Sequence, residues 1–236
     1  MGSLSVIVPL GPNENAFGRL AADLLLLPGD SELVFVACRP VEAYPWRAAL
    51  ERVLSGRRLR WIEAPEGRAR QMNAAAVAAS GDWLWFLHWD SGFGPALVSR
   101  IQQAVRQPLL AMSYARLQFM DDGPAITRLN ARLANWRSRW LGVPFGDQGF
   151  VLPKELFVRV GGFDEAAAFG EDHLLVWQLR LAGVPLIMLD APLLTSARKY
   201  RRHGWSRLTL RYQWMWMRQA WPYAWQLVRS RLSYRR

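Results

Sequence analysis

Short apolar runs alternate with helix-like segments along the first part of the chain. The runs are rich in β-branched and aromatic residues, which favour strands. They span residues 4–10, 32–38, 59–64 and 83–88. Between them, the Ala and Leu content and the spacing of apolar positions predict helices at residues 15–27, 43–54 and 68–79. Strands that are apolar on both faces and separated by helices predict a mostly parallel, Rossmann-like sheet with helices on both faces.

The second half follows a less regular pattern of the same kind. Strands are predicted at residues 109–119, 146–153 and 185–196. Helices are predicted at residues 126–141 and 171–182. We therefore expect one α/β domain over residues 1–204.

The last segment, residues 205–236, predicts a basic, Trp-rich helical tail. Its apolar side chains recur at steps of three and four, as they do along one face of a helix. We call these positions the tail stripe: Leu210, Trp214, Met217, Trp221, Trp225, Val228 and Leu232. The arginines of the segment lie largely off the stripe, and Pro222 predicts a bend or break.

Three partners are compatible with such an amphipathic tail. The tail stripe either packs on the core of its own domain or lies in a membrane interface, with its aromatic rings at headgroup depth. Nucleic acid is the least favoured partner, because no recognised nucleic-acid-binding motif accompanies the charge.

The net charge of +11 is concentrated in the same region. The chain has 30 Lys and Arg residues against 19 Asp and Glu residues. Eleven of the basic residues and none of the acidic ones lie between Thr195 and Arg236, so the other 19 basic residues balance the 19 acidic ones. Such a block favours an anionic partner, and we expect the tail to meet an anionic membrane surface.

Length and composition bound the remaining possibilities. A chain of 236 residues can bury one substantial core. We expect neither a spanning helix nor a secretory signal, because no uncharged apolar run of about 18 residues and no basic-then-apolar amino-terminal segment is present. The single cysteine, Cys38, excludes an internal disulfide and a cysteine-built metal cluster. These features predict a cytoplasmic protein, peripheral on the inner face of the membrane.

Polar residues follow several of the predicted strands. Asp90 comes directly after the apolar run at residues 83–88, and Asn13 and Glu14 follow the first run. Ligands of parallel α/β sheets bind at the carboxyl ends of strands, so these side chains are candidates for a site. Taken singly, Asp90 is equally compatible with a helix cap.

A second candidate lies at the start of the helix predicted at residues 68–79. Gly67 forms a turn, and Arg68 and Arg70 open the helix. Free backbone N–H groups and guanidinium groups in such a position suit a phosphate, although two arginines there are also compatible with solvated surface.

Five short motifs occur in one order along the chain. They read "GRARQMN", "FLH-x-D", "GDQ-x-F", "GGF" and "ED-x-x-L-x-x-x-L". Together they resemble glycosyltransferases of family 2, which have the GT-A type fold, and within them the bacterial subgroup called arsenosugar-biosynthesis-type. The resemblance covers roughly residues 4–205 and is specific for the family and only suggestive for the substrate.

The resemblance implies an enzyme that transfers a sugar from a nucleotide-diphosphate sugar to an acceptor hydroxyl with inversion. A divalent cation, Mg²⁺ or Mn²⁺, bridges the donor phosphates in that family, and an Asp deprotonates the acceptor. Asp90 matches the last carboxylate of the family's Asp-x-Asp motif, with His88 in the first position. Asp172 matches the catalytic base.

The other expected site residues follow from the same resemblance. His203 resembles a further metal contact beside Asp90, although a lone His in an arginine-rich loop is equally compatible with a solvated side chain. Contacts with donor or acceptor are expected from Pro9, Asn13, Glu14, Arg68, Arg70, Asn73, His88, Asp147, Gln148, Glu171, Arg198 and Lys199.

One departure from the family pattern concerns the nucleoside. Most relatives end the second strand with an Asp that contacts it, whereas this chain has Ala37, Cys38 and Arg39 there, with Glu42 as a substitute. The expectation of a uridine donor is therefore weakened. The alternative is a degenerate, non-catalytic member of the fold that binds a nucleotide or a glycan. The acceptor is not indicated by the sequence, and a lipid-linked one would agree with the tail.

Overall fold

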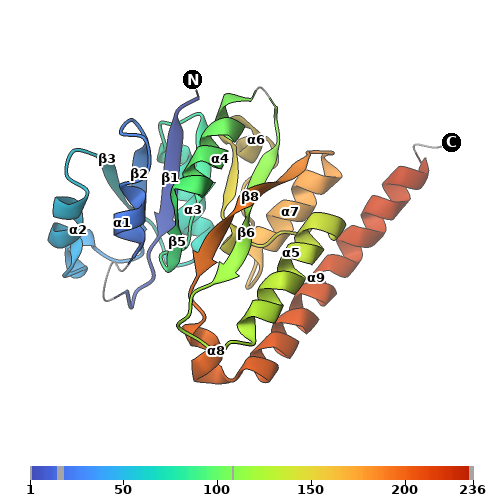
Figure 1. Ribbon diagram of the computed structural model, residues 1–236. Helices are drawn as coiled ribbons and strands as arrows, with labels where there is room; N and C mark the ends of the chain where they lie inside the picture. The colour runs from blue at the N-terminus through green and yellow to red at the C-terminus, as the bar shows by residue number, and fades with distance from the viewer. Residues whose placement is uncertain (1, 15–18, 108, 234–236) are drawn as a thin grey trace.

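The fold is that of a computed structural model, which describes residues 2–14, 19–107 and 109–233, apart from the side chains of His203, Val228 and residues 230–233. Its centre is an eight-stranded sheet with helices around it (Figure 1). The strands are β1 (Leu4–Pro9), β2 (Glu32–Ala37), β3 (Arg58–Glu63), β4 (Trp83–Phe86), β5 (Ser91–Phe93), β6 (Met112–Phe119), β7 (Phe150–Pro153) and β8 (Leu186–Thr195).

The strand order is β3-β2-β1-β4-β7-β6-β8-β5. Strands β1 to β4 pair in parallel, as do β6 and β8, while β7 runs antiparallel to both β4 and β6, and β5 antiparallel to β8. Six strands therefore point the same way, and the expected mostly parallel α/β sheet is confirmed.

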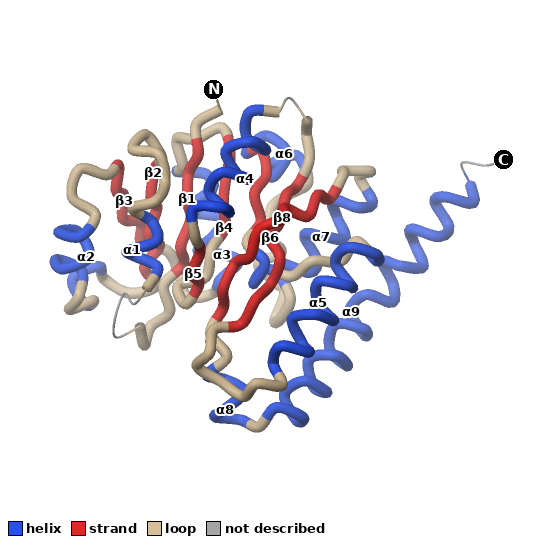
Figure 2. Tube along the Cα trace, in the orientation of Figure 1, coloured by secondary structure: helices blue, strands red, loops and turns tan. Residues whose placement is uncertain are grey.

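Helices and 3-10 turns connect these strands (Figure 2). They are α1 (Leu20–Leu24), η1 (Val41–Ala43), α2 (Arg47–Val53), α3 (Arg68–Ala78), α4 (Pro95–Arg106), α5 (Thr127–Leu141), η2 (Gly146–Gln148), α6 (Lys154–Arg159), α7 (Glu171–Leu181), α8 (Arg198–His203) and α9 (Trp205–Ser233).

The core has one layer on each face of the sheet. Successive residues of a strand point to opposite faces. Accordingly Val6 and Val8 of β1 join the cluster that includes residues of α1, α2 and α4, whereas Ile7 joins the cluster with α3, α6 and α7. Burial on both faces explains why these strands read as continuous apolar runs.

Three helices differ from the prediction. The helix expected at residues 43–54 begins only at Arg47, because a residue before proline avoids helical geometry and Tyr44 precedes Pro45 in an extended conformation. Helix α4 was not predicted, although Pro95 occupies its first turn. The helix predicted at residues 15–27 is observed as α1, and residues 15–18 lie outside the described part of the chain.

Helix α9 runs without a break through Pro222. Its inner face, with Trp216, Ala220, Tyr223, Ala224 and Leu227, packs against Val143 and Trp177. The described members of the tail stripe point away from the protein, with 51–76% of each residue exposed. The interpretation that this stripe packs on the core is therefore wrong, because a different face of the same helix does so.

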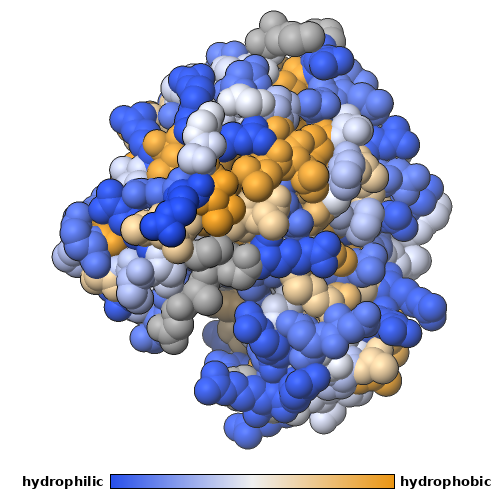
Figure 3. Space-filling model, turned by 60° about the vertical axis from the view of Figure 1, so that its left-hand side comes forward, coloured by the Kyte–Doolittle hydropathy of each residue, from blue (hydrophilic) through white to orange (hydrophobic). Residues whose placement is uncertain are grey.

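The surface is uneven in character. Figure 3 turns the side with α2 and β3 forward and shows mainly hydrophilic side chains, with an apolar area in the upper half of the view. Among the described residues, no helix combines the length and the apolar character that crossing a bilayer requires.

Candidate functional site

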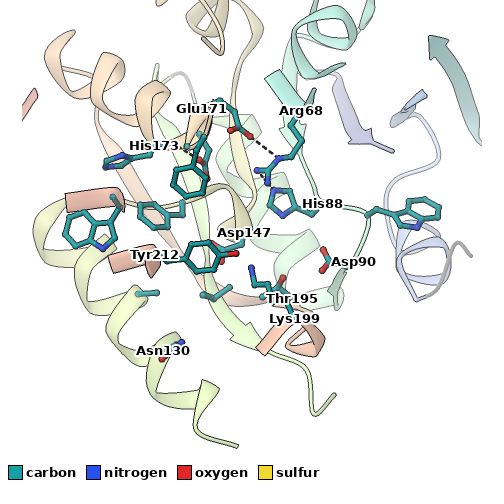
Figure 4. Close-up of a pocket in the computed structure, with 18 of the residues that line it drawn as sticks. Arg68, His88, Asp90, Asn130, Asp147, Glu171, His173, Thr195, Lys199 and Tyr212 are labelled. Carbon is teal, nitrogen blue, oxygen red and sulfur yellow. Dashed lines mark hydrogen bonds and ion pairs between the residues drawn. The ribbon is translucent and has the colours of Figure 1, made fainter. Parts of the chain in front are cut away.

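A cavity of about 560 Å³ opens at the carboxyl edge of the sheet (Figure 4). The strand ends supply one side of it, with Pro9, Leu10, His88, Asp90 and Thr195. Residues of α3, β6, α5, η2, α7, α8 and α9 and of the neighbouring loops supply the rest. A cavity of this volume is large enough for a small-molecule ligand.

The direction of β7 brings the loop before it to this edge. Strand β7 is antiparallel to β4, so its amino-terminal end lies beside the carboxyl end of β4. Turn η2, directly before β7, therefore places Asp147 across from Asp90. Topology thus unites two acidic positions that are 57 residues apart in the sequence.

Arg68 links the two sides of the cavity. Its Nε lies 3.0 Å from Glu171 Oε1, and its Nη2 lies 2.9 Å from His88 Nε2 (Figure 4). Arginine only donates hydrogen bonds, so Nε2 of His88 accepts and the imidazole is neutral with its proton on Nδ1. Burial, and then the charges of Arg68 and Lys199, lower the pKa of His88 well below its usual value.

Asp90 and Glu14 form an acidic pair beside β1. Burial raises the pKa of Asp90, while the charges of Lys199, Arg198 and Arg68 oppose the rise. Burial and the charge of Asp90 raise the pKa of Glu14. The two carboxyl groups are thus close enough to sense one another in a basic surrounding.

Asp147 occupies the centre of the cavity. Burial raises the pKa of its carboxyl group, and the positive charges of Lys199 and Arg137 reduce that rise. The Lys199 ammonium reaches the same space from α8 and lies 5.3 Å from the centre of the Tyr212 ring (Figure 4). Asp147 is therefore a desolvated carboxyl group that senses nearby cations and the neighbouring carboxylate of Asp172.

Asp172 lies in the first turn of α7 and is held by backbone donors. Its Oδ2 accepts a hydrogen bond from Gly146 N at 2.5 Å, and its Oδ1 accepts one from His173 N at 2.9 Å. A side chain at position 146 would place its Cβ 2.9 Å from Oδ2, which explains the glycine there. Each carboxylate oxygen keeps a further lone pair for a ligand.

Most of the expected site residues line this one cavity. They are Pro9, Glu14, Arg68, His88, Asp90, Asp147, Glu171, Asp172, Arg198 and Lys199. Arg198 also contacts Asp122, with 3.6 Å between Nε and Oδ2, so part of its charge is balanced outside the cavity.

Four expected residues do not line the cavity, and a fifth cannot be placed. Asn13 and Arg70 are exposed, and Asn73 binds the backbone of Phe163 through both ends of its amide. Gln148 is fully buried, where it accepts from Ser138 and donates to the Ala115 carbonyl. The side chain of His203 lies outside the described residues.

The wall formed by α5 and α9 was not predicted. It consists of Asn130, Ala134, Arg137, Thr209, Tyr212, Gln213, Trp216 and Gln219. The α9 members recur at steps of three and four, which is a second helical stripe beside the tail stripe. That periodicity is visible in the sequence, but the sequence alone does not show that a cavity faces it.

The oxygen and nitrogen atoms of the cavity decide whether a metal ion could bind there. Within the described residues, no group of three or more His, Cys, Asp or Glu side chains is arranged to hold one. The oxygen pair of Asp90 and Glu14 nevertheless fits a hard cation that takes its other ligands from a diphosphate and water. Nε2 of His88 already accepts from Arg68 and is not available as a ligand in this arrangement.

No protein-family model matches the chain, and no curated protein matches it significantly. Solved structures do. A mannosyltransferase, PcManGT from Pyrobaculum calidifontis, in complex with GDP-Man and Mn²⁺, matches with a TM-score of 0.67 and 18% identity over 86% of this chain. TarS residues 1–349 from S. aureus, in complex with UDP-GlcNAc, match with a TM-score of 0.64 and 15% identity over 82%. GalNAc-T7 with UDP, GalNAc and Mn²⁺ matches with a TM-score of 0.63 and 12% identity over 83%.

The chain spans 59%, 58% and 44% of the lengths of these three proteins. At such identities the similarity is one of fold, and the activities belong to the compared proteins. The chain therefore has the GT-A type fold, with its cavity at the carboxyl edge of the sheet.

Proposed function

We propose that the protein is an inverting glycosyltransferase of family 2, close to the arsenosugar-biosynthesis-type subgroup. It transfers a sugar from a nucleotide-diphosphate sugar to an acceptor hydroxyl. The observation that carries the proposal is the gathering of Asp90, Asp147 and Asp172 with Lys199 and Arg68 around one cavity of a GT-A type fold.

The basic residues of the cavity bind the donor. Lys199 and Arg198 face the acidic pair of Asp90 and Glu14, where a diphosphate would add negative charge. Charge-assisted contacts of ammonium and guanidinium groups with phosphate are strong and direct the diphosphate to this end of the cavity. Asp90, with Glu14 beside it, would hold the divalent cation.

When bound, that cation stabilises negative charge on the departing phosphate oxygen. The chain supplies the proton transfer. Asp172 takes the proton of the acceptor hydroxyl as the hydroxyl oxygen bonds to the sugar carbon and the carbon–phosphate oxygen bond breaks. Two backbone N–H groups fix the Asp172 carboxylate, so its orientation is set before the substrates bind.

The donor half of the proposal is tested by calorimetric titration of UDP, GDP, dTDP and CDP into the protein, with and without Mn²⁺. We expect at least one nucleotide to bind only with Mn²⁺ and to bind at least about tenfold more weakly to Asp90→Ala. Asp30→Ala removes an exposed carboxylate outside the cavity and is the matched control. Failure of all four nucleotides to bind would overturn the donor assignment.

The second candidate is a non-catalytic member of the fold that binds a nucleotide or a glycan. The same two backbone hydrogen bonds to Asp172 favour it, because they also describe a carboxylate that merely stabilises the start of α7. Under this alternative, the nucleotide sugar binds but is not consumed when it is supplied together with candidate acceptors. Release of nucleoside diphosphate that depends on Asp172 would reject it.

A further inference from the structure

Helices α5 and α9 each expose a row of large apolar side chains. On α5 these are Leu129, Leu133, Trp136 and Trp140, of which 43–68% is exposed. On α9 they are the described members of the tail stripe, of which 51–76% is exposed. Exposed Leu and Trp residues in such rows mark a surface that meets another apolar phase.

The two helices run side by side in the same direction (Figures 1 and 2). Asn130 Nδ2 donates to Thr209 Oγ1 at 3.0 Å, and about two turns further along both helices the Arg137 guanidinium lies 5.7 Å from the Trp216 ring centre. Positions 130, 134 and 137 of α5 and positions 209, 213 and 216 of α9 thus occupy the facing sides.

The two apolar rows lie on the same side of this helix pair. In α5 the row comes one residue before the facing positions, at 129, 133 and 136. In α9 it comes one residue after them, at 210, 214 and 217. For parallel helices, a step of one residue back on one and one residue forward on the other turns toward the same side. The rows therefore form one apolar surface, which we call the α5–α9 surface.

Arginines border this surface on both outer edges. On α5, Arg128 and Arg132 each precede a residue of the apolar row. On α9, Arg211 and Arg218 each follow one, and all four arginines are exposed. Neither helix contains an acidic residue, and the Asp121 carboxylate that lies 3.4 Å from Arg128 belongs to the preceding loop. An apolar centre with a cationic border is the pattern of helices that lie in an anionic membrane interface.

We propose that the α5–α9 surface docks the protein on an anionic lipid bilayer. Tryptophan and leucine side chains enter the headgroup region, while the bordering arginines pair with lipid phosphates. A second copy of the chain is a poorer occupant, because it would bring these arginines against one another. Nucleic acid would use the arginines but leave the aliphatic and Trp rows in water.

Docking places the cavity next to the bilayer. Other faces of the same two helices line the cavity with Asn130, Arg137, Tyr212 and Trp216, so no more than one helix diameter, about 10 Å, separates cavity and lipid. If the proposed transfer activity holds, the acceptor is one that the membrane carries. The docking itself does not depend on that activity.

The test is co-sedimentation of the full chain with sucrose-loaded vesicles of phosphatidylcholine, with and without phosphatidylglycerol. We expect binding to the anionic vesicles that weakens as salt is raised. The combined variant Trp136→Ser, Trp214→Ser and Trp221→Ser is expected to bind at least about tenfold more weakly. Arg211→Glu with Arg218→Glu is expected to lose the preference for anionic vesicles.

The matched control is Val77→Ser with Val158→Ser, which removes exposed apolar side chains from α3 and α6 instead. Circular dichroism and nucleotide titration check that each variant is folded. Undiminished vesicle binding by the triple Trp variant would overturn the proposal. So would a dimer in sedimentation equilibrium that the same variant abolishes, or tighter binding to duplex DNA than to anionic vesicles.

Discussion

At the scale of single residues, two carboxyl groups in the cavity have different surroundings. Asp172 accepts two backbone hydrogen bonds, which fix the orientation of its carboxylate. Burial raises the pKa of Asp147, and the charges of Lys199 and Arg137 reduce that rise. We therefore assign the proton transfer to Asp172 and an electrostatic or substrate-orienting role to Asp147.

Asp172→Asn tests the first assignment. The amide keeps one oxygen for a backbone donor but does not take a proton, so kcat is expected to fall by roughly 10²–10⁴-fold while nucleotide binding changes little. Measurement of nucleoside diphosphate release together with calorimetric titration separates the two effects. Loss of nucleotide binding in this variant would assign Asp172 to the donor site instead.

Asp147→Asn tests the second assignment through stability. Because burial raises the folded-state pKa of Asp147 above its unfolded value, the folded state holds more protons between these two values. Stability therefore falls as the pH rises through that interval, and the loss is complete once the pH exceeds the folded-state pKa. Asparagine does not ionise, so the variant is expected to have the higher Tm at pH 7 and a shrinking advantage on acidification. Equal Tm values throughout would contradict the cost assigned to the buried charge.

At the scale of elements, a hydrogen-bond chain joins α7 to α9. Trp177 Nε1 donates to His173 Nε2 at 2.8 Å, and since the indole only donates, the proton of His173 lies on Nδ1 and is given to Gln219 Oε1 at 2.8 Å. Gln219 Nε2 in turn donates to the Phe169 carbonyl at 3.0 Å. This chain fixes α9 as a wall of the cavity.

Gln219→Ala removes the middle of the chain. It leaves the Nδ1–H group of the buried His173 without its acceptor, which costs roughly 1–3 kcal/mol. Hydrogen exchange is expected to accelerate in α9 more than in the sheet. Gln226→Ala changes an exposed Gln on the same helix and is expected to leave the exchange as it is. If Gln219→Ala leaves hydrogen exchange in α9 as slow as Gln226→Ala does, packing alone holds α9.

Acid is expected to loosen the same contact. Burial lowers the pKa of His173, with the charges of Arg137 and Arg180 adding to the effect, and the Gln219 hydrogen bond and Asp172 opposing it. A lowered histidine pKa gives stability that is present above the unfolded value, about 6.5, and is lost as the pH falls toward the folded value. Thermal unfolding between pH 7 and pH 5 measures this loss, which His173→Gln should diminish.

At the scale of the whole molecule, α9 serves the core, the cavity and the α5–α9 surface with different faces. Its inner face covers Trp177 and Val143, and Tyr212 and Trp216 line the cavity. Its outer face carries the exposed part of the tail stripe. Membrane docking and ligand binding are therefore expected to be separable by surface substitution and not by removal of the helix.

Truncation of the chain after residue 204 removes all of α9 and therefore affects more than membrane docking. Uncovering Trp177 and Val143 costs roughly 3–6 kcal/mol, which is comparable to the whole stability of many domains. We expect this truncation to lower Tm strongly and to weaken nucleotide binding. The triple Trp variant of the α5–α9 surface should keep both, as urea unfolding and calorimetric titration can measure. An unchanged Tm after truncation would contradict the role given to the inner face.

Much of the fold was predictable because its signals are local. The apolar runs of β1, β2 and β4 are continuous because each strand is buried on both faces, and the position of Asp90 directly after an apolar run indicated the sheet edge. The helix at residues 126–141 was likewise predicted almost to its observed bounds, Thr127–Leu141. Sequence by itself thus determined most strands and helices, the α/β class and the charge of the tail.

Only the tertiary structure decided which part of the protein each helix face contacts and which distant strands pair. Helical periodicity predicted the tail stripe as one face of α9, but only the tertiary packing shows that a different face, with Ala220 and Tyr223, lies against Trp177 and that the described part of the tail stripe is exposed. The meeting of Asp90 with Asp147 likewise depends on β7 running antiparallel beside β4, a pairing between distant segments. Such pairings are set by the sum of contacts across the molecule, which no short stretch of the chain contains.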